Sequence, residues 1–372
     1  MSLRVLVVPD KFKGTLTARQ AAEAIALGWG EVRPSDKVEC LPMADGGDGF
    51  GEVLGKLLGA ERRTCSTIDS AGRSRDAEWW LQKQTATAIV ETAQVNGLAL
   101  LPTGQFHPNQ LDTYGIGAVF REVQNEGARH IFVGIGGSAT NDGGFGMARS
   151  LGWKFLDSRG VGIQHWTELS QLDRVEPPSN ALEFDGFIIA VDVANPLLGN
   201  DGASRVYGPQ KGLRESDFPK AEACLRRLSE VMQQHHGEDY SILPGAGAAG
   251  GLGFGLKAFC RGSFRSGGEI FAQLSGLESR IQEADLIITG EGAMDSQTLM
   301  GKGVGVIAQA AARAGKPCLC LAGAVTVDLD TVPWPNFKSF SIVPEIASLE
   351  EAKSNAFQCL QRLAARAARR RD

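Results

Sequence analysis

The sequence lacks an apolar run long enough to cross a membrane. The strand-like run LRVLVV (3–8) is followed at once by Pro-Asp and a charged segment, whereas a spanning helix needs about 20 apolar residues. The chain also lacks an excess of positive charge, because its net charge is −5 at pH 7. Nucleic-acid binding requires a basic face that displaces counterions. We therefore expect neither a membrane protein nor a nucleic-acid-binding protein.

Cysteine and histidine are sparse and do not form metal or disulfide patterns. The 7 cysteines are an odd number scattered over 372 residues, which is typical of reduced thiols in a cytoplasmic protein rather than of a disulfide framework. The 5 histidines never form the HExxH spacing of zinc hydrolases. We expect a cytoplasmic protein without a zinc centre.

Three familiar nucleotide or nucleophile motifs are incomplete. The Walker pattern fails because Ser296 stands at its first glycine and Gly303 at its hydroxyl position. The nucleophile elbow GxSxG fails because Thr140 replaces its last glycine. A formal GxGxxG begins at Gly245, but the residues before it are a poor strand. P-loop enzymes and α/β-hydrolases are thereby excluded, and a nicotinamide-dependent oxidoreductase stays open as an alternative.

The chain is long enough for about two domains. Apolar runs of strand length alternate with amphipathic helical segments near both termini, over 3–8, 17–30, 37–43, 286–290, 304–315, 317–323 and 350–370. Closely spaced strand candidates suited to hairpins follow in the middle, over 62–68, 77–82 and 87–93. We predict a discontinuous Rossmann-like α/β domain with a parallel sheet (1–68 plus 284–372) and an inserted mixed α/β domain (69–283).

Glycine-rich loops carry the chemistry of the remaining sequence. The loops after the strands at 130–134 and 286–290 combine glycines, hydroxyls and carboxylates at strand ends, where α/β proteins bind ligands. Phosphoryl transfer needs cations, backbone N–H groups and a carboxylate that orients the attacking hydroxyl. The loops supply each of these groups.

Read together, six segments resemble the type-I glycerate kinase family. They are PDKFKGTLTA (9–18), PMADGGDGF (42–50), GIGGSATNDGGFGM (134–147), DVANPLLGNDGA (192–203), PGAGAAGGLG (244–253) and ITGEGAMDSQTLMGKGVGVIA (288–308). The resemblance implies ATP-dependent phosphorylation of D-glycerate with Mg²⁺, usually giving 2-phosphoglycerate. The chain departs from the family pattern at Ala293, where arginine is common, and at Val304, where proline is common. An arginine offers five donors for a phosphate or carboxylate, so its absence affects nucleotide or glycerate binding unless another cation substitutes.

Within that resemblance we assign candidate roles to loop residues. Binding of substrate or phosphate is expected from Asp10, Lys11, Lys13, Ser138, Thr140, Asn141, Asn195 and Lys302. Asp45 is expected to orient substrate or to act through Mg²⁺, and Glu291 and Asp142 are expected to bind that metal. Asp192 and Asp295 are the two alternatives for the catalytic base.

Several questions stay open at the level of sequence. They are which carboxylate is the base, which hydroxyl is phosphorylated, which domain holds ATP, and the oligomeric state, a homodimer included. A noncatalytic sugar-acid-binding member of the same fold is a further alternative, since the arginine after GEG is absent at Ala293.

Overall fold

The chain folds into two α/β units, and the structure, a computed structural model, describes residues 2–299 and 303–370. Unit 1 combines residues 1–45 and 268–372, and unit 2 comprises residues 46–267. The predicted fold class, a discontinuous parallel-sheet domain with an inserted mixed α/β domain, is confirmed. The limits of the units differ from the predicted limits at 68/69 and 283/284. Residues 46–68 belong to unit 2, where they form a helix and an edge strand of its sheet, and residues 268–283 belong to unit 1.

Unit 1 begins and ends with strand–helix alternation. Its elements are β1 (Arg4–Pro9), α1 (Ala18–Val32), β2 (Lys37–Cys40), α9 (Gly267–Ser275, which starts at the boundary), α10 (Leu277–Glu283), β11 (Leu286–Met294), α11 (Ser296–Leu299), α12 (Val304–Arg313), β12 (Cys318–Val325), a short 3₁₀ turn (Leu329–Thr331), β13 (Phe337–Val343), α13 (Leu349–Ser354) and α14 (Ala356–Arg369).

The sheet of unit 1 is parallel and covered on both faces. In the described residues its five strands lie in the order β13-β12-β11-β1-β2. Side chains alternate along β12: Leu319 and Leu321 join the core with α1 and α14, whereas Cys320 and Ala322 face Val304 of α12. Burial on both faces explains why these strands are continuous apolar runs rather than alternating ones.

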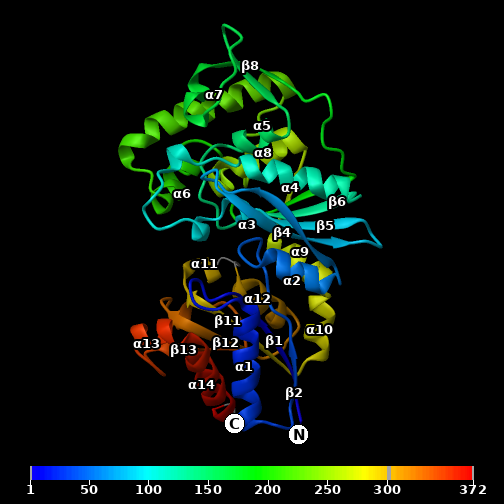
Figure 1. Cartoon of the computed structure of the whole chain (residues 1–372). Helices are drawn as coiled ribbons and strands as arrows, with labels where there is room; N and C mark the ends of the chain where they lie inside the picture. The colour runs from blue at the N-terminus through cyan, green and yellow to red at the C-terminus, as the bar shows by residue number, and fades with distance from the viewer. Residues whose placement is uncertain (1, 300–302, 371–372) are drawn as a thin grey trace. The chain divides into compact units, whose positions relative to one another are not determined.

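Helix α1 is specified at its start by a capping box and along its length by small residues. The Thr17 side chain accepts from the Gln20 backbone N–H at 3.2 Å, and the Gln20 side chain accepts from the Thr17 N–H at 3.0 Å. The buried alanines of α1 face α14, and the two helices lie side by side in unit 1 (Figure 1). A Cβ atom on Gly28 would lie 2.0 Å from the carbonyl oxygen of Gln361, so only glycine permits this close approach.

We expect Gly28→Ala to destabilise the protein by about 1–3 kcal/mol, because the added methyl overpacks the α1–α14 contact. Gly30 in the same helix is the matched control, since a Cβ there meets no atom within 4 Å. Gly30→Ala should stabilise by up to about 1 kcal/mol through helix propensity. Urea denaturation of both variants checks the pair, and equal stability changes would contradict this account of the helix contact.

Unit 2 is larger and mixed. Its elements are α2 (Phe50–Leu57), β3 (Glu61–Ile68), β4 (Ser74–Gln82), β5 (Thr87–Glu91), α3 (Ala93–Asn96), η1 (Leu98–Leu100), η2 (Pro108–Gln110), α4 (Tyr114–Asn125), β6 (His130–Gly134), α5 (Phe145–Ser150), β7 (Lys154–Asp157), η3 (Trp166–Gln171), β8 (Leu172–Glu176), β9 (Gly186–Ala190), α6 (Ala203–Lys211), η4 (Glu215–Asp217), α7 (Phe218–His236), α8 (Ala248–Cys260) and β10 (Ser263–Arg265).

The main sheet of unit 2 joins an antiparallel meander to a parallel half. Among the described residues its six strands lie in the order β10-β9-β6-β5-β4-β3. Strands β3, β4 and β5 form the predicted hairpins, whereas β5, β6, β9 and β10 run parallel. Trp79 packs in the main core and Trp80 packs against Gly51 and Gly55 of α2, as expected for adjacent strand residues that face opposite sides.

The carboxyl ends of β5, β6, β9 and β10 therefore meet at one edge of this sheet, where ligand-binding loops are expected. No helix in the described ranges, 2–299 and 303–370, is long and apolar enough to span a membrane.

Candidate functional site

In unit 1, candidate residues gather at the carboxyl ends of β1 and β11. Strand β1 is followed in sequence by its neighbour β2 on one side, whereas β11 is followed by β12 on the other. The strand order thus reverses between β1 and β11, and such a switch point is where open α/β sheets bind ligands. Asp10 directly follows β1, and Glu291 lies in the last part of β11.

Loop 10–16 places a lysine beside a carboxylate. The Lys11 Nζ lies 3.1 Å from Asp45 Oδ1, and both side chains are half-buried. The Lys11 backbone N–H donates to Asp10 Oδ1 at 2.7 Å, and Asp10 itself is buried. A tight turn between Phe12 and Leu16 fixes the loop. Two predicted residues, Lys11 and Asp45, are thus brought together although they are far apart in sequence.

The Glu291 carboxyl lies in a cluster of acidic groups. Its Oε1 accepts the hydroxyl of Thr298 at 2.7 Å. Burial raises the pKa of Glu291 to about 7, and repulsion from Asp10, Asp295 and Asp45 adds to the effect. The carboxylates of this cluster therefore repel one another, and a bound cation would reduce that repulsion.

Gly303 marks the point on which two of these carboxylates converge. A Cβ atom on Gly303 would lie 3.5 Å from Glu291 Oε2 and 3.6 Å from Asp10 Oδ2. Gly303 has a φ of +52° and precedes α12, so the two carboxylates lie beside the start of that helix. Helix starts attract anions, whereas carboxylates attract cations. The start of α12 and the two carboxylates therefore bring an anion-binding group and a cation-binding group together.

The oxygen donors of this cluster fit Mg²⁺ held in part by a substrate. Among the described residues, no group of three or more His, Cys, Asp or Glu side chains is arranged as a complete metal site. Mg²⁺ is usually bound by one or two carboxylates together with water and substrate phosphates. Asp10 and Glu291, which both face Gly303, satisfy that requirement.

The remaining predicted residues of unit 1 are placed as follows. The Asp295 backbone N–H donates to the Thr298 hydroxyl at 3.2 Å, which sets the turn before α11. Lys13 is exposed, and Lys302 lies outside the described residues. Ala293 is exposed, whereas Val304 is the first residue of α12 and packs in a buried apolar cluster. Proline is favoured at the first helical position, and with valine in its place α12 still begins at this residue.

In unit 2, the buried side chain of Lys211 forms hydrogen bonds to the loop after β6. The Lys211 Nζ donates to the Thr140 carbonyl oxygen at 2.7 Å and lies 3.1 Å from Ser138 Oγ. The Ser138 hydroxyl in turn donates to the Ala249 carbonyl at 3.0 Å. Burial lowers the pKa of Lys211 to about 7, while Asp142 opposes that shift. Lys211 is thus a buried lysine with a lowered pKa, and the sequence reasoning did not identify it as a site residue.

Asn141 and Asp142 are completely buried beneath the same loop. The Asn141 amide donates to the Ser204 hydroxyl at 2.9 Å. The Asp142 carboxylate accepts two hydrogen bonds from Thr113, one from Gly144 and one from the Gly146 N–H. Because these donors occupy both oxygens, the geometry favours a turn-holding role for Asp142 over the predicted metal binding.

The loop after β9 contains Asp192 and Asn195. Asp192 Oδ1 accepts the Ser266 hydroxyl at 2.6 Å, at the ends of the paired strands β9 and β10. Asn195 donates to the Asp201 carbonyl at 2.8 Å and accepts the Tyr207 hydroxyl at 2.6 Å. Asp192 is therefore oriented by a neighbouring loop, whereas the side chain of Asn195 braces its own loop.

The glycine-rich segment 244–253 supports these loops rather than forming a dinucleotide fingerprint. It does not follow a strand, and Ala249, Gly250 and Gly251 interrupt α8 with left-handed backbone angles. A Cβ atom on Gly250 would lie 1.9 Å from the Thr140 carbonyl oxygen. The glycines therefore allow close backbone packing, and the βα context that a Rossmann cofactor site requires is absent at this segment.

Glu91 is a second buried charged residue that the sequence reasoning missed. It ends β5, is buried, and accepts the Gly49 and Gly51 N–H groups at 3.1 and 3.0 Å. These bonds fix the start of α2 within the motif 42–50. The only sequence signal was a carboxylate at the end of an otherwise apolar run, TAIVE.

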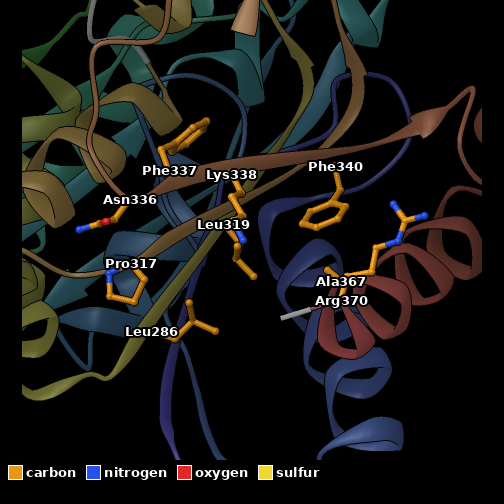
Figure 2. Close-up of a pocket in the computed structure, with 9 residues that line it drawn as sticks. All are labelled: Leu286, Pro317, Leu319, Asn336, Phe337, Lys338, Phe340, Ala367 and Arg370. Atoms are coloured by element: carbon orange, nitrogen blue, oxygen red, sulfur yellow. The ribbon is translucent and has the colours of Figure 1, made fainter. Parts of the chain in front are cut away.

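A cavity of about 250 Å³ lies near the amino-terminal ends of the strands in the unit 1 sheet. Figure 2 shows it between residues of β11, β12 and β13, such as Leu286, Leu319 and Phe340, and the end of α14 at Ala367 and Arg370. The lining includes the amino-terminal ends of the strands. Because ligands of parallel sheets bind at the carboxyl ends, this cavity is separate from the candidate site.

Comparison with known proteins gives one consistent family. The family model described as the glycerate kinase family matches residues 5–371. The chain is 36% identical to a glycerate kinase of Halalkalibacterium halodurans, over 97% of this chain and 96% of the relative. It is also 36% identical to the glycerate 2-kinase of Escherichia coli K12, over 95% and 94%. The crystal structure of a candidate glycerate kinase 2 from Salmonella typhimurium LT2 superposes with a TM-score of 0.81 at 34% identity, over 99% of this chain and 98% of that one.

Proposed function

The chain belongs to the glycerate kinase family, whose members are phosphotransferases, and from this premise we propose that it transfers the γ-phosphoryl group of ATP to the 2-hydroxyl of D-glycerate. The products would be 2-phosphoglycerate and ADP. The E. coli relative, a glycerate 2-kinase at 36% identity, supports this choice of hydroxyl.

The observation that carries the proposal is the charge arrangement at the β1–β11 switch point. A lysine paired with Asp45 lies beside a carboxylate cluster, and two of those carboxylates face the start of α12. Phosphoryl transfer is catalysed mainly by positioning and by electrostatic stabilisation of the transferred group. Cationic, anionic and backbone donor groups at one sheet edge are the components that this chemistry needs.

Each residue then takes a defined role in the proposal. Lys11 and Lys13 bind an anionic group of a substrate, while Asp45 holds the Lys11 ammonium in position. Asp10 and Glu291 would hold Mg²⁺, which when bound shields the charge of the phosphates. Either Asp192 or Asp295 accepts the proton of the attacking hydroxyl as oxygen–phosphorus bond formation proceeds.

The loop residues of unit 2 contribute neutral hydrogen bonds. Ser138 and Thr140 lie in a loop fixed by Lys211 and by Gly250. Asn141 supports the same loop by its hydrogen bond to the Ser204 hydroxyl. Asn195 supports the loop after β9 by its hydrogen bond to the Asp201 carbonyl. We assign these two asparagines to the support of the binding loops, and the serine and threonine to substrate or phosphate binding.

The proposal is tested with purified protein, Mg-ATP and D-glycerate. ADP formation is followed, and the product is identified by phosphorus NMR. We expect 2-phosphoglycerate. Formation of 3-phosphoglycerate would overturn the choice of hydroxyl but keep the kinase activity, whereas ADP release no faster than without protein would contradict the kinase proposal and favour a noncatalytic binding protein.

A further inference from the structure

A large cavity in unit 2 borders the loop that carries Ser138 and Thr140. It has a volume of about 750 Å³ and is lined by segments 98–111 and 209–214, within the roughly 300–1,000 Å³ typical of small-molecule sites. Such a volume is far larger than a three-carbon acid fills. A ligand that used the whole cavity would be of the size of a nucleotide.

Lys211 connects this cavity to the loop that carries Ser138 and Thr140. The residue lines the cavity, yet its side chain is buried and donates to the Thr140 carbonyl and towards Ser138 Oγ. A lysine ammonium has three donors, and these two contacts leave one of them available. Among the residues that the structure describes, no carboxylate forms an ion pair with Lys211. Asp142 favours the charged form of Lys211 but does not outweigh burial. A buried cation without a direct ion-pair partner is unfavourable, and an anionic ligand group would relieve that cost.

The walls of the cavity suit a flat, partly apolar ring. Leu98 is unusually exposed for a leucine, at 37%, and Leu101 and Phe106 are half-buried. The lining also includes the polar residues Gln105 and Gln210. An apolar surface with a few placed hydrogen-bonding groups is the usual composition of a small-molecule site, and it matches the face and the edge of a purine.

We propose that this cavity binds the adenosine part of ATP, with the phosphate chain directed to Lys211 and the Ser138 loop. The inference rests on the proposed kinase function, since it assigns the nucleotide of that reaction to unit 2. It also gives Lys211 a role as a phosphate-binding residue. D-Glycerate would then bind elsewhere.

The experiment measures ADP binding by calorimetry without glycerate, together with KM for ATP and for D-glycerate. Leu98→Trp adds bulk to the cavity wall at an exposed position. We expect the Kd for ADP and the KM for ATP to rise at least about tenfold while the KM for D-glycerate changes less than about twofold. Val206→Trp is the matched control: Val206 is 42% exposed, lies in α6 like Lys211, and does not line the cavity.

Lys211→Met removes the ammonium with a side chain of similar length, and Lys211→Arg restores the charge. The Met variant should lose ADP affinity by at least about tenfold, and the Arg variant should recover part of it. An equal loss in both variants, with a similar fall in melting temperature, would indicate a purely structural lysine and overturn its phosphate-binding role. Leu98→Trp then still tests the cavity, because its side chain is at the surface.

The outcomes separate the two proposals. Wild-type protein that binds ADP but does not phosphorylate D-glycerate would overturn the proposed function, and loss of that binding in Leu98→Trp would keep the cavity assignment. Wild-type protein that is active, with ADP affinity unchanged in Leu98→Trp, would overturn the cavity assignment alone. A rise confined to the KM for D-glycerate would assign the cavity to the acid instead. A wild-type protein that neither binds ADP nor phosphorylates D-glycerate would overturn both proposals.

Discussion

Asparagine in place of the catalytic base should lower kcat by about 100-fold or more. The two candidates are Asp192 and Asp295, and each substitution preserves the shape of the side chain. Asp192→Asn keeps an amide oxygen that can accept the Ser266 hydroxyl, now at 2.6 Å from the carboxylate. Asp295→Asn leaves the backbone hydrogen bonds with Thr298 intact. A large fall in kcat with unchanged melting temperature would therefore report loss of proton transfer rather than unfolding.

Ser266→Ala helps to distinguish the base from a positioning group. It removes the hydroxyl that donates to Asp192 but leaves the carboxylate in place. If Asp192 is the base, this variant should retain more activity than Asp192→Asn and should show a pH–rate profile shifted to higher pH, because loss of a donor to the charged form raises a carboxyl pKa. Steady-state kinetics from pH 5 to 9 would measure it, over roughly the range in which enzymatic bases titrate. Near-wild-type kcat in both asparagine variants would rule out both candidates.

The sequence predicted the parallel sheet of unit 1 because its signals are local. Continuous apolar runs indicate strands that are buried on both faces. Thr17 and Gln20 predict the start of α1 by a capping-box pattern, and the structure contains that capping box. The meeting of Lys11 with Asp45 also follows from strand topology, since both residues lie beyond the carboxyl ends of neighbouring strands β1 and β2.

Lys211 and Glu91 could not be predicted in this way. In sequence, Lys211 belongs to YGPQKGL and reads as a solvated lysine at a helix end. Its importance arises only when α6 packs beneath the β6 loop and removes the ammonium from water. The role of Glu91 depends equally on two backbone N–H groups from a segment 40 and 42 residues earlier. Tertiary burial, and no local pattern, creates both features.

Substitution of Lys11 by methionine should lower kcat/KM by about 100-fold, as expected for loss of a charge-assisted contact to an anionic substrate. The prediction is checked by steady-state kinetics with each substrate varied in turn. Lys316→Met is the control, because Lys316 lies in the same unit and donates to the Gln282 and Ala284 carbonyls at 2.7 and 2.8 Å. That variant should alter stability with little change in kcat/KM.

A double-mutant cycle then separates substrate binding from structural pairing. The Lys11–Asp45 pair is half-buried, and ion pairs near the surface contribute only up to about 1 kcal/mol to stability. Lys11→Met protein should therefore stay folded, and a 100-fold loss of its activity would not report unfolding. If Lys11 serves only to neutralise Asp45, the double variant Lys11→Met/Asp45→Asn should recover activity. If Lys11 binds the substrate anion directly, as we propose, the double variant should remain as impaired as Lys11→Met, because no cation replaces the one removed.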